Sequence, residues 1–139
     1  WSTVANTEEI FAAMTLNDII LTPVVTAYYD INEVNGWYWN LALSQPLEVS
    51  DVLSFEVGAS LGYGSKNYNE AYFSEDNGSG AVNDYNVYVS GSYALTEQLS
   101  LGALLQYSCL DGGVGDDFEA NAGETDNLVW GGVSLSYTF

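Results

Sequence analysis

The sequence has almost no basic residues. One lysine, no arginine and no histidine stand against 19 acidic residues, which gives a formal net charge of −18. Binding to nucleic acid or to anionic lipid through a basic patch is therefore excluded. The lack of histidine excludes Ser-His triads and histidine metal sites, and the single cysteine, Cys109, can form neither an internal disulfide nor a zinc cluster. We expect no enzymatic activity and no catalytic residue.

Long apolar runs are also missing. The chain is 47% hydrophobic, yet no uninterrupted apolar segment approaches the roughly 18 residues that a membrane-spanning helix needs. Only two prolines occur, whereas there are 14 Gly, 11 Tyr, 4 Trp and 5 Phe. This composition favours strands joined by turns. The chain begins at Trp1 with no secretory signal, as expected of a mature product or of part of a longer one.

The C-terminal segment 127–139 alternates apolar with small or polar residues and ends on an aromatic residue. Because side chains of a strand point to alternate faces, one face carries Val129, Val133, Leu135, Tyr137 and Phe139, and the other carries Ser134, Ser136 and Thr138. Such a segment resembles the closing strand of bacterial outer-membrane β-barrels, in which this end is the assembly signal. Tyr137 and Phe139 are therefore candidates for recognition by the barrel-assembly machinery.

Strand character extends along the whole chain. Seven segments have it: 7–16, 19–31, 37–47, 53–64, 84–95, 99–110 and 127–139. Most have about the 9 to 11 residues with which a tilted strand crosses a bilayer. Their connections alternate between short turns (17–18, 46–51 and 96–98) and longer loops (30–36, 65–83 and 111–126). We therefore expect an all-β fold, an antiparallel up-and-down transmembrane β-barrel with about seven strands in a single domain over residues 1–139.

The acidic residues avoid the expected strands. With Phe139 at the periplasmic end, fourteen acids, Asp84 among them, fall on the cell-surface side, four fall on the periplasmic side, and only Glu56 lies within a span. A charge facing hydrocarbon costs about 2 kcal/mol or more near the midplane. The distribution therefore indicates lipid contact and an acidic cell-surface rim.

The more apolar side of each strand predicts its lipid face. In 53–64, for example, Phe55, Val57 and Leu61 point outward and Glu56 inward. The same reasoning gives the candidate lumen residues Glu56, Tyr38, Asn40, Asn86, Tyr88 and Gln106. Outward aromatic residues then fall at both ends of the strands, as in aromatic girdles: Tyr63, Tyr85, Tyr107, Tyr29 and Trp37 at one end, and Phe55, Tyr93, Tyr137 and Phe139 at the other.

The facing of segments 7–16 and 19–31 stays open. In 19–31, for example, Val24, Thr26 and Tyr28 on one side compete with Val25, Ala27 and Tyr29 on the other.

Seven strands are too few for a closed barrel of the usual kind. Bacterial single-chain barrels usually contain an even number of strands, and the first segment here would descend from the cell-surface side. An open edge in the bilayer leaves unpaired backbone groups that cost several kcal/mol each. We therefore expect this chain to be the C-terminal portion of a longer barrel, or to obtain further strands from another copy or a partner.

Two loops combine glycine with acidic residues. Glu75, Asp76, Asp111, Asp116 and Asp117 offer the oxygen ligands that calcium prefers, and they are candidates for a metal site. Neither loop has EF-hand spacing or a calcium-binding repeat. Diffuse screening by divalent cations is the favoured alternative, because the acids of one rim repel one another. We expect no other cofactor.

Four segments also carry a family resemblance. Residues 21–30, 53–64, 93–101 and 130–139 are similar to the C-terminal half of a family of uncharacterised proteobacterial outer-membrane barrels, and the resemblance extends over the chain from about residue 9. It implies a location in the outer membrane of a Gram-negative bacterium, contact with outer-membrane lipid, and additional N-terminal strands after a signal peptide. It supplies no catalytic or ligand-binding residue.

Two classes of function fit these features. The first is a passive, porin-like channel, in which small inner residues leave room for water and an inner carboxylate such as Glu56 favours cations. The second is a structural or surface-interaction barrel with a closed lumen, which assembles with other chains through strand edges or acidic loops. A soluble secreted β-protein is a third, less favoured reading, because two exposed apolar faces argue against solubility without detergent.

Overall fold

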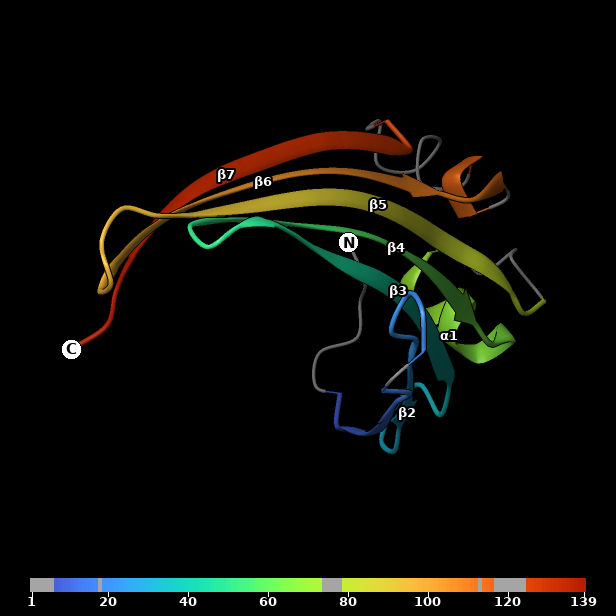
Figure 1. The fold of residues 1–139 in the computed structure, drawn as a ribbon. Coiled ribbons are helices and arrows are strands. Elements are labelled where there is room, and N and C mark those ends of the chain that lie inside the picture. Colours follow the sequence, from blue (N-terminus) through green and yellow to red (C-terminus); the bar gives the residue numbers. More distant parts are fainter. Residues whose placement is uncertain (1–6, 18, 74–78, 113, 117–124) are drawn as a thin grey trace.

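The computed structural model describes residues 7–17, 19–73, 79–112, 114–116 and 125–139 and consists of one seven-stranded antiparallel sheet (Figure 1). Each strand pairs with its neighbours in sequence, in the order β1 to β7. The strands are β1 (Glu9–Thr15), β2 (Val24–Asp30), β3 (Trp37–Ser50), β4 (Leu53–Gly64), β5 (Ala81–Ala94), β6 (Leu99–Leu110) and β7 (Asn127–Tyr137). The predicted all-β, up-and-down architecture is confirmed.

The sheet is curved but not closed. Figure 1 shows β4 to β7 as a long arch, from which β3, β2 and β1 turn down at one side to leave a concave interior. In the described part of the chain, β1 pairs only with β2, and β7 pairs only with β6. Each of these two strands therefore has a free backbone edge, as expected for part of a barrel wall.

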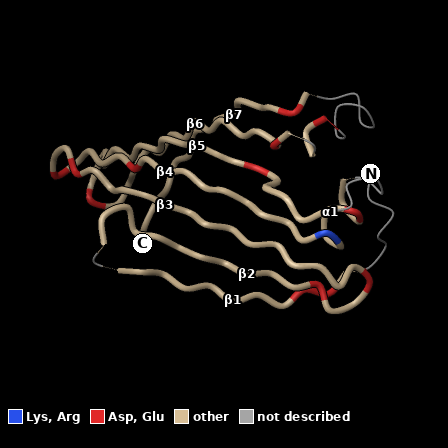
Figure 2. Tube along the Cα trace, turned by 90° about the vertical axis from the view of Figure 1, so that its right-hand side faces the viewer, with Lys and Arg blue, Asp and Glu red and all other residues tan. Residues whose placement is uncertain are grey.

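The predicted alternation of short turns and longer loops holds from β3 onward, but the connection between β1 and β2 (16–23) is longer than the connection between β2 and β3 (31–36). The connections that follow β1, β3 and β5 lie at one end of the sheet, and those that follow β2, β4 and β6 lie at the opposite end. We call these the turn end and the loop end. Most acidic residues lie near one or other end of the strands (Figure 2).

The N-terminal strands are shorter than predicted. β1 and β2 have seven residues each, and residues 19–23, expected to be strand, form a turn. Leu21 and Thr22 have positive φ angles of 70° and 26°, and Pro23 has no N–H to donate to a ladder. The turn is instead held by three backbone bonds: from the Leu16 N–H to the Pro23 carbonyl and from the Ser44 N–H to the Leu21 carbonyl, each 2.9 Å, and from the Thr22 N–H to the Ile19 carbonyl at 3.1 Å.

Other strands extend beyond their predicted limits. β3 runs to Ser50, so Glu48 lies within a strand, and β5 starts at Ala81, so Asp84, the predicted first residue of its strand, lies further inside it. Glu9 and Asp30 are terminal residues of β1 and β2. The prediction that Glu56 is the single acid within a membrane span is not tested by these strand limits. Backbone pairing continues past the apolar part of each strand, to positions where water or polar side chains can solvate a carboxylate.

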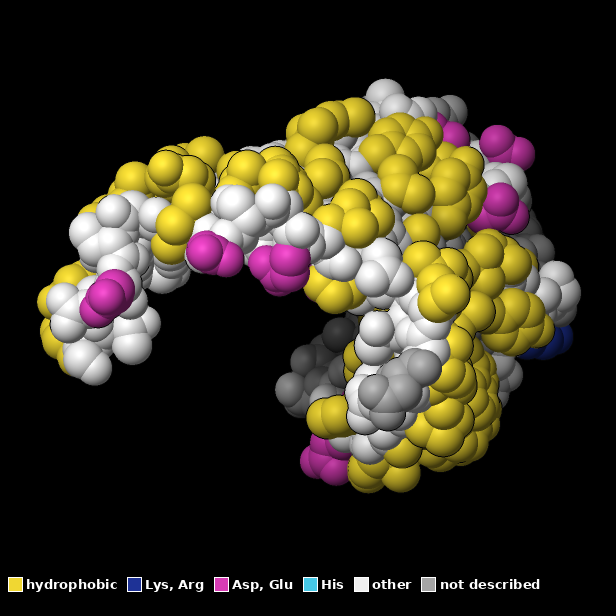
Figure 3. All heavy atoms as spheres, viewed as in Figure 1, with side chains coloured by type: hydrophobic (Ala, Val, Ile, Leu, Met, Phe, Trp, Pro, Cys, Tyr) yellow, Lys and Arg dark blue, Asp and Glu magenta, His cyan; other side chains and the backbone are white. Residues whose placement is uncertain are grey.

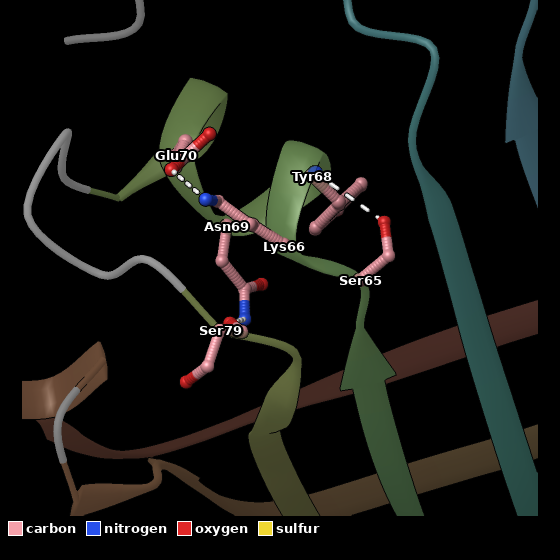
Figure 4. Close-up of polar contacts among 6 residues, drawn as sticks. All are labelled: Ser65, Lys66, Tyr68, Asn69, Glu70 and Ser79. Carbon is pink, nitrogen blue, oxygen red and sulfur yellow. Dashed lines mark hydrogen bonds and ion pairs between the residues drawn. The ribbon is translucent and has the colours of Figure 1, made fainter.

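A short helix interrupts the segment 65–83, which was expected to be loop throughout. The helix α1 (Lys66–Tyr72) is N-capped by Ser65, whose hydroxyl accepts a bond from the Tyr68 N–H at 3.5 Å (Figure 4). Asn69 Nδ2 donates to the Ser79 carbonyl at 3.4 Å and so joins α1 to the chain that leads into β5. Among the described residues, no helix has the length and apolar content needed to cross a membrane.

The two faces of the sheet differ in polarity. On the convex face, Val57, Val89 and Leu105 stand opposite one another on adjacent strands and are 40%, 40% and 55% exposed. Figure 3 shows hydrophobic side chains over the outside of the arch and polar and acidic side chains along its underside. Such a large exposed apolar surface is typical of a face that contacts lipid or another molecule.

Candidate functional site

The concave face brings together the six side chains predicted to line a lumen. Directly opposed residues of neighbouring strands share a face. Asn40 stands opposite Gly62, on the same face of β4 as Ser60, Gly58 and Glu56. The remaining strands continue this face through the pairs Ser60–Asn86, Gly58–Tyr88 and Tyr88–Gln106. All six side chains therefore lie on the polar side of the sheet, and their role in lining a closed lumen stays a prediction.

A chain of side-chain hydrogen bonds crosses four strands of this face. Gln106 Nε2 donates to Asn86 Oδ1 at 3.3 Å, and Asn86 Nδ2 donates to Asp84 Oδ1 at 2.9 Å and to Ser60 Oγ at 3.2 Å. Tyr38 donates its hydroxyl to the other oxygen of Asp84 at 2.7 Å. Asp84 is thus the acceptor at the centre of the network, although it was predicted only as an acid at the cell-surface end of its strand and not as a lumen residue.

A second tyrosine–carboxylate pair lies nearer the turn end. Tyr88 donates its hydroxyl to Glu56 Oε1 at 2.6 Å, which is a short hydrogen bond between oxygen atoms. The Tyr88 ring lies across Gly58, so closely that a Cβ atom on Gly58 would overlap it. Gly62 stands in the same relation to Tyr38 and Asp84. The glycines of β4 therefore give the two tyrosines space to reach their carboxylates.

Aromatic rings form a row at the loop end of the concave face. The ring centroids of Phe11 and Tyr28 are 5.9 Å apart, those of Tyr28 and Tyr38 6.0 Å, and those of Tyr38 and Tyr68 5.2 Å. The row continues from Tyr68 to Tyr72 at 4.6 Å. This row places Tyr28 on the concave face, a choice that the sequence left open, and it shows that α1 packs against the polar side of the sheet.

The rings border a hollow of about 430 Å³, lined by Glu9, Tyr28, Tyr38, Asn40 and Tyr68. The pKa of Tyr68 is raised to about 12, first by burial and then by the neighbouring Tyr72 and the negative charges of Glu9 and Asp84. Tyr68 is therefore a neutral phenol at physiological pH, and Glu9, which is exposed, is the one acidic side chain that lines the hollow.

The turn end of the concave face carries much smaller side chains. Cross-strand pairing places Ser92, Gly102 and Ser134 in one row and Ser100 and Ser136 in the next. This face of the sheet is thus bulky at the loop end and open at the turn end.

Aromatic residues also gather on the convex face near the loop end. The Tyr29 and Trp37 ring centroids are 4.5 Å apart, those of Trp37 and Trp39 are 5.8 Å apart, and Trp39 stands opposite Tyr63. At the turn end the rings of Tyr137 and Phe139 meet edge to face at 5.2 Å. This placement of Tyr29, Trp37 and Tyr63 agrees with the expected outer girdle.

The structure leaves the calcium prediction untested. Glu75, Asp76 and Asp117 lie outside the described residues. Of the two remaining candidates, Asp111 donates its backbone N–H to the Asn83 carbonyl at 2.8 Å. No group of three or more potential metal-ligating side chains occurs in the described part of the chain.

Comparison with known proteins identifies a family for this chain. The sequence matches the family model MipA, MltA-interacting protein MipA, over residues 7–139. The match includes every strand of the sheet and both ends of the concave face. No curated protein matches the chain.

Proposed function

The chain belongs to the MipA family, and from this premise we propose that it forms part of the wall of an outer-membrane β-barrel that acts as a passive channel. The observation that carries the proposal is the opposite polarity of the two faces. The convex face exposes Val57, Val89 and Leu105, as a lipid-facing surface requires, whereas the concave face carries a hydrogen-bonded polar network, as water-filled barrels do.

The free edges of β1 and β7 require further strands. In hydrocarbon, every backbone N–H and C=O of an unpaired edge costs several kcal/mol. We infer that these edges pair with strands from a longer form of the chain or from another copy, which would convert the open arch into a closed barrel. The Tyr137 and Phe139 rings at the turn end supply the expected signal for the barrel-assembly machinery, with this end on the periplasmic side.

Single-channel recording in planar lipid bilayers tests the channel proposal. We expect the purified, complete barrel to give stepwise conductance with a preference for cations. The Glu56→Gln variant should lower the cation preference, because it removes a carboxylate from the concave face. Glu97→Gln, which removes a charge from the turn between β5 and β6, is the matched control and should change it less. A correctly folded barrel without conductance would reject a channel.

A second function is favoured by the family itself, which is named for interaction with MltA. On this proposal the barrel is a structural element with a closed lumen, and it binds a partner protein through its loops, turns or strand edges. Binding of purified MltA to the detergent-solubilised full-length protein, followed by biolayer interferometry, tests it. Saturable binding would support this function, and its absence together with conductance would favour the channel.

A further inference from the structure

The hollow at the loop end of the concave face combines aromatic rings with negative charge. Glu9 comes from β1, Tyr28 from β2, Tyr38 and Asn40 from β3, and Tyr68 from α1. Four different elements thus converge on one space, and all three tyrosines are partly buried. The row of ring contacts holds these side chains in place without filling the space between them.

No basic side chain of the protein neutralises this hollow. The chain has a single basic residue, Lys66, and its Nζ atom pairs with Glu70 on the adjacent turn of α1 at 3.5 Å (Figure 4). Lys66 and Glu70 do not line the hollow. The Glu9 carboxylate therefore lies beside tyrosine rings with no cation of the protein to pair with.

We propose that this hollow is a binding site for an organic ammonium ion, such as the amino groups of a polyamine. Glu9 would supply the counter-charge, the faces of Tyr28 and Tyr68 would contact the cation, and the side-chain oxygen of Asn40 would accept an N–H. Ring faces attract ammonium groups through their quadrupole, and the attraction grows when the site is partly desolvated.

The charge of the hollow favours this ligand over a neutral sugar. Aromatic rings beside polar groups can also bind a sugar, but a neutral sugar gains less from the charge of the Glu9 carboxylate than an ammonium ion does. A metal ion fits less well, because the lining offers one carboxylate and one amide, fewer oxygens than calcium requires. Binding of an ammonium ion in the hollow does not require the barrel to conduct ions, so a barrel without conductance would not contradict this proposal.

Calorimetric titration of the full-length protein with spermidine tests the proposal. The protein would be kept in a polyoxyethylene detergent, whose headgroup has neither a sugar nor an ammonium group, at about 0.15 M NaCl to screen diffuse charge. Two pairs of variants each compare a residue that lines the hollow with its neighbour in the sequence, which does not. Glu9→Gln is matched by Glu8→Gln, which removes the same charge outside the hollow, and Tyr28→Leu is matched by Tyr29→Leu on the convex face.

We expect saturable binding whose Kd rises about fivefold or more in Glu9→Gln and in Tyr28→Leu, and less than about twofold in the two matched controls. Tyr28→Phe should bind as the unmodified protein does, because it keeps the ring. Thermal unfolding of each variant shows that it is folded.

Three results would overturn the proposal. The first is no binding by folded protein. The second is an equal loss in Glu9→Gln and Glu8→Gln, which would indicate diffuse attraction to an acidic surface. The third is that maltotriose binds with the same dependence on Tyr28 while spermidine does not, which would indicate a sugar site.

Discussion

An arginine placed at Val89 tests directly whether the convex face contacts lipid. Val89 lies in the apolar part of β5, opposite Val57 and Leu105, and is 40% exposed. Arginine facing the bilayer midplane costs about 2–4 kcal/mol, but only about 0–1 kcal/mol near the interface. An exposed surface substitution in water usually costs about 0.5 kcal/mol or less. We therefore expect Val89→Arg to lower the folding equilibrium constant by about thirtyfold to a thousandfold in vesicles.

The assay is guanidinium unfolding of the complete barrel in lipid vesicles, followed by tryptophan fluorescence. Two control variants separate the effect of the face of the sheet from the effect of depth in the bilayer. Ser90→Arg changes the adjacent residue on the concave face, where an acidic and polar surface solvates the guanidinium, and it should cost less than about 1 kcal/mol. Tyr85→Arg lies on the same face as Val89 but nearer the loop end, so its cost should be intermediate or small.

Two results would refute this assignment of faces. If Val89→Arg and Ser90→Arg are equally tolerated, the convex face is not in hydrocarbon. If Ser90→Arg is the costlier of the two, the lipid-facing and inner sides have been exchanged. Equal tolerance of the two variants, together with a protein that is folded and soluble in detergent-free buffer, would favour a secreted β-protein.

Three further predictions concern local structure and the acidic rim. Asp30→Ala should cost about 1–3 kcal/mol, because Asp30 Oδ1 accepts three loop N–H bonds at 2.9 to 3.3 Å; Asp30→Asn keeps the acceptor and should lose less in thermal unfolding. Gly58→Val should displace the Tyr88 ring and destabilise the sheet by about 1–3 kcal/mol. A second substitution in the same chain, Tyr88→Ala, should restore part of the lost stability. If divalent ions only screen the rim, NaCl at equal ionic strength should replace CaCl2 in restoring thermal stability after EDTA treatment; a calcium-specific increase would indicate a metal site.

The architecture was predictable because one simple pattern runs through most strands. The predicted limits 53–64 and 99–110 coincide with β4 and β6. Both strands alternate large apolar with small or polar residues, and period-two alternation defines both the strand and its faces. Glu56 could be placed on the polar side for the same reason.

The features that the sequence did not predict depend on contacts between distant segments. Both sides of segment 24–29 carry a valine and a tyrosine, so only pairing with β3, which sets Tyr28 opposite Tyr38, decides their facing. The helix α1 has seven residues, too few to be stable alone, and it depends on packing of Tyr68 against Tyr38. Its one local signal was Ser65, a favourable N-cap residue. Asp84 belongs to the polar network because β5 starts at Ala81, before its predicted start at Asp84, and sets Asp84 opposite Gly62, where its carboxylate accepts the bond from Tyr38.

The uneven bulk of the concave face separates the two proposed functions. In a channel, the rings at the loop end form the narrow part, so Tyr38→Ala should raise single-channel conductance, and Ser134→Trp in the open half should change it little. In a barrel with a closed lumen, small residues such as Ser134 and Gly102 would instead allow close packing of a plug or neighbouring chain. Ser134→Trp should then destabilise the complete barrel by about 1–3 kcal/mol through overpacking. Conductance and thermal unfolding of the same two variants therefore distinguish an open from a filled interior, and a barrel in which neither variant changes either quantity would contradict both.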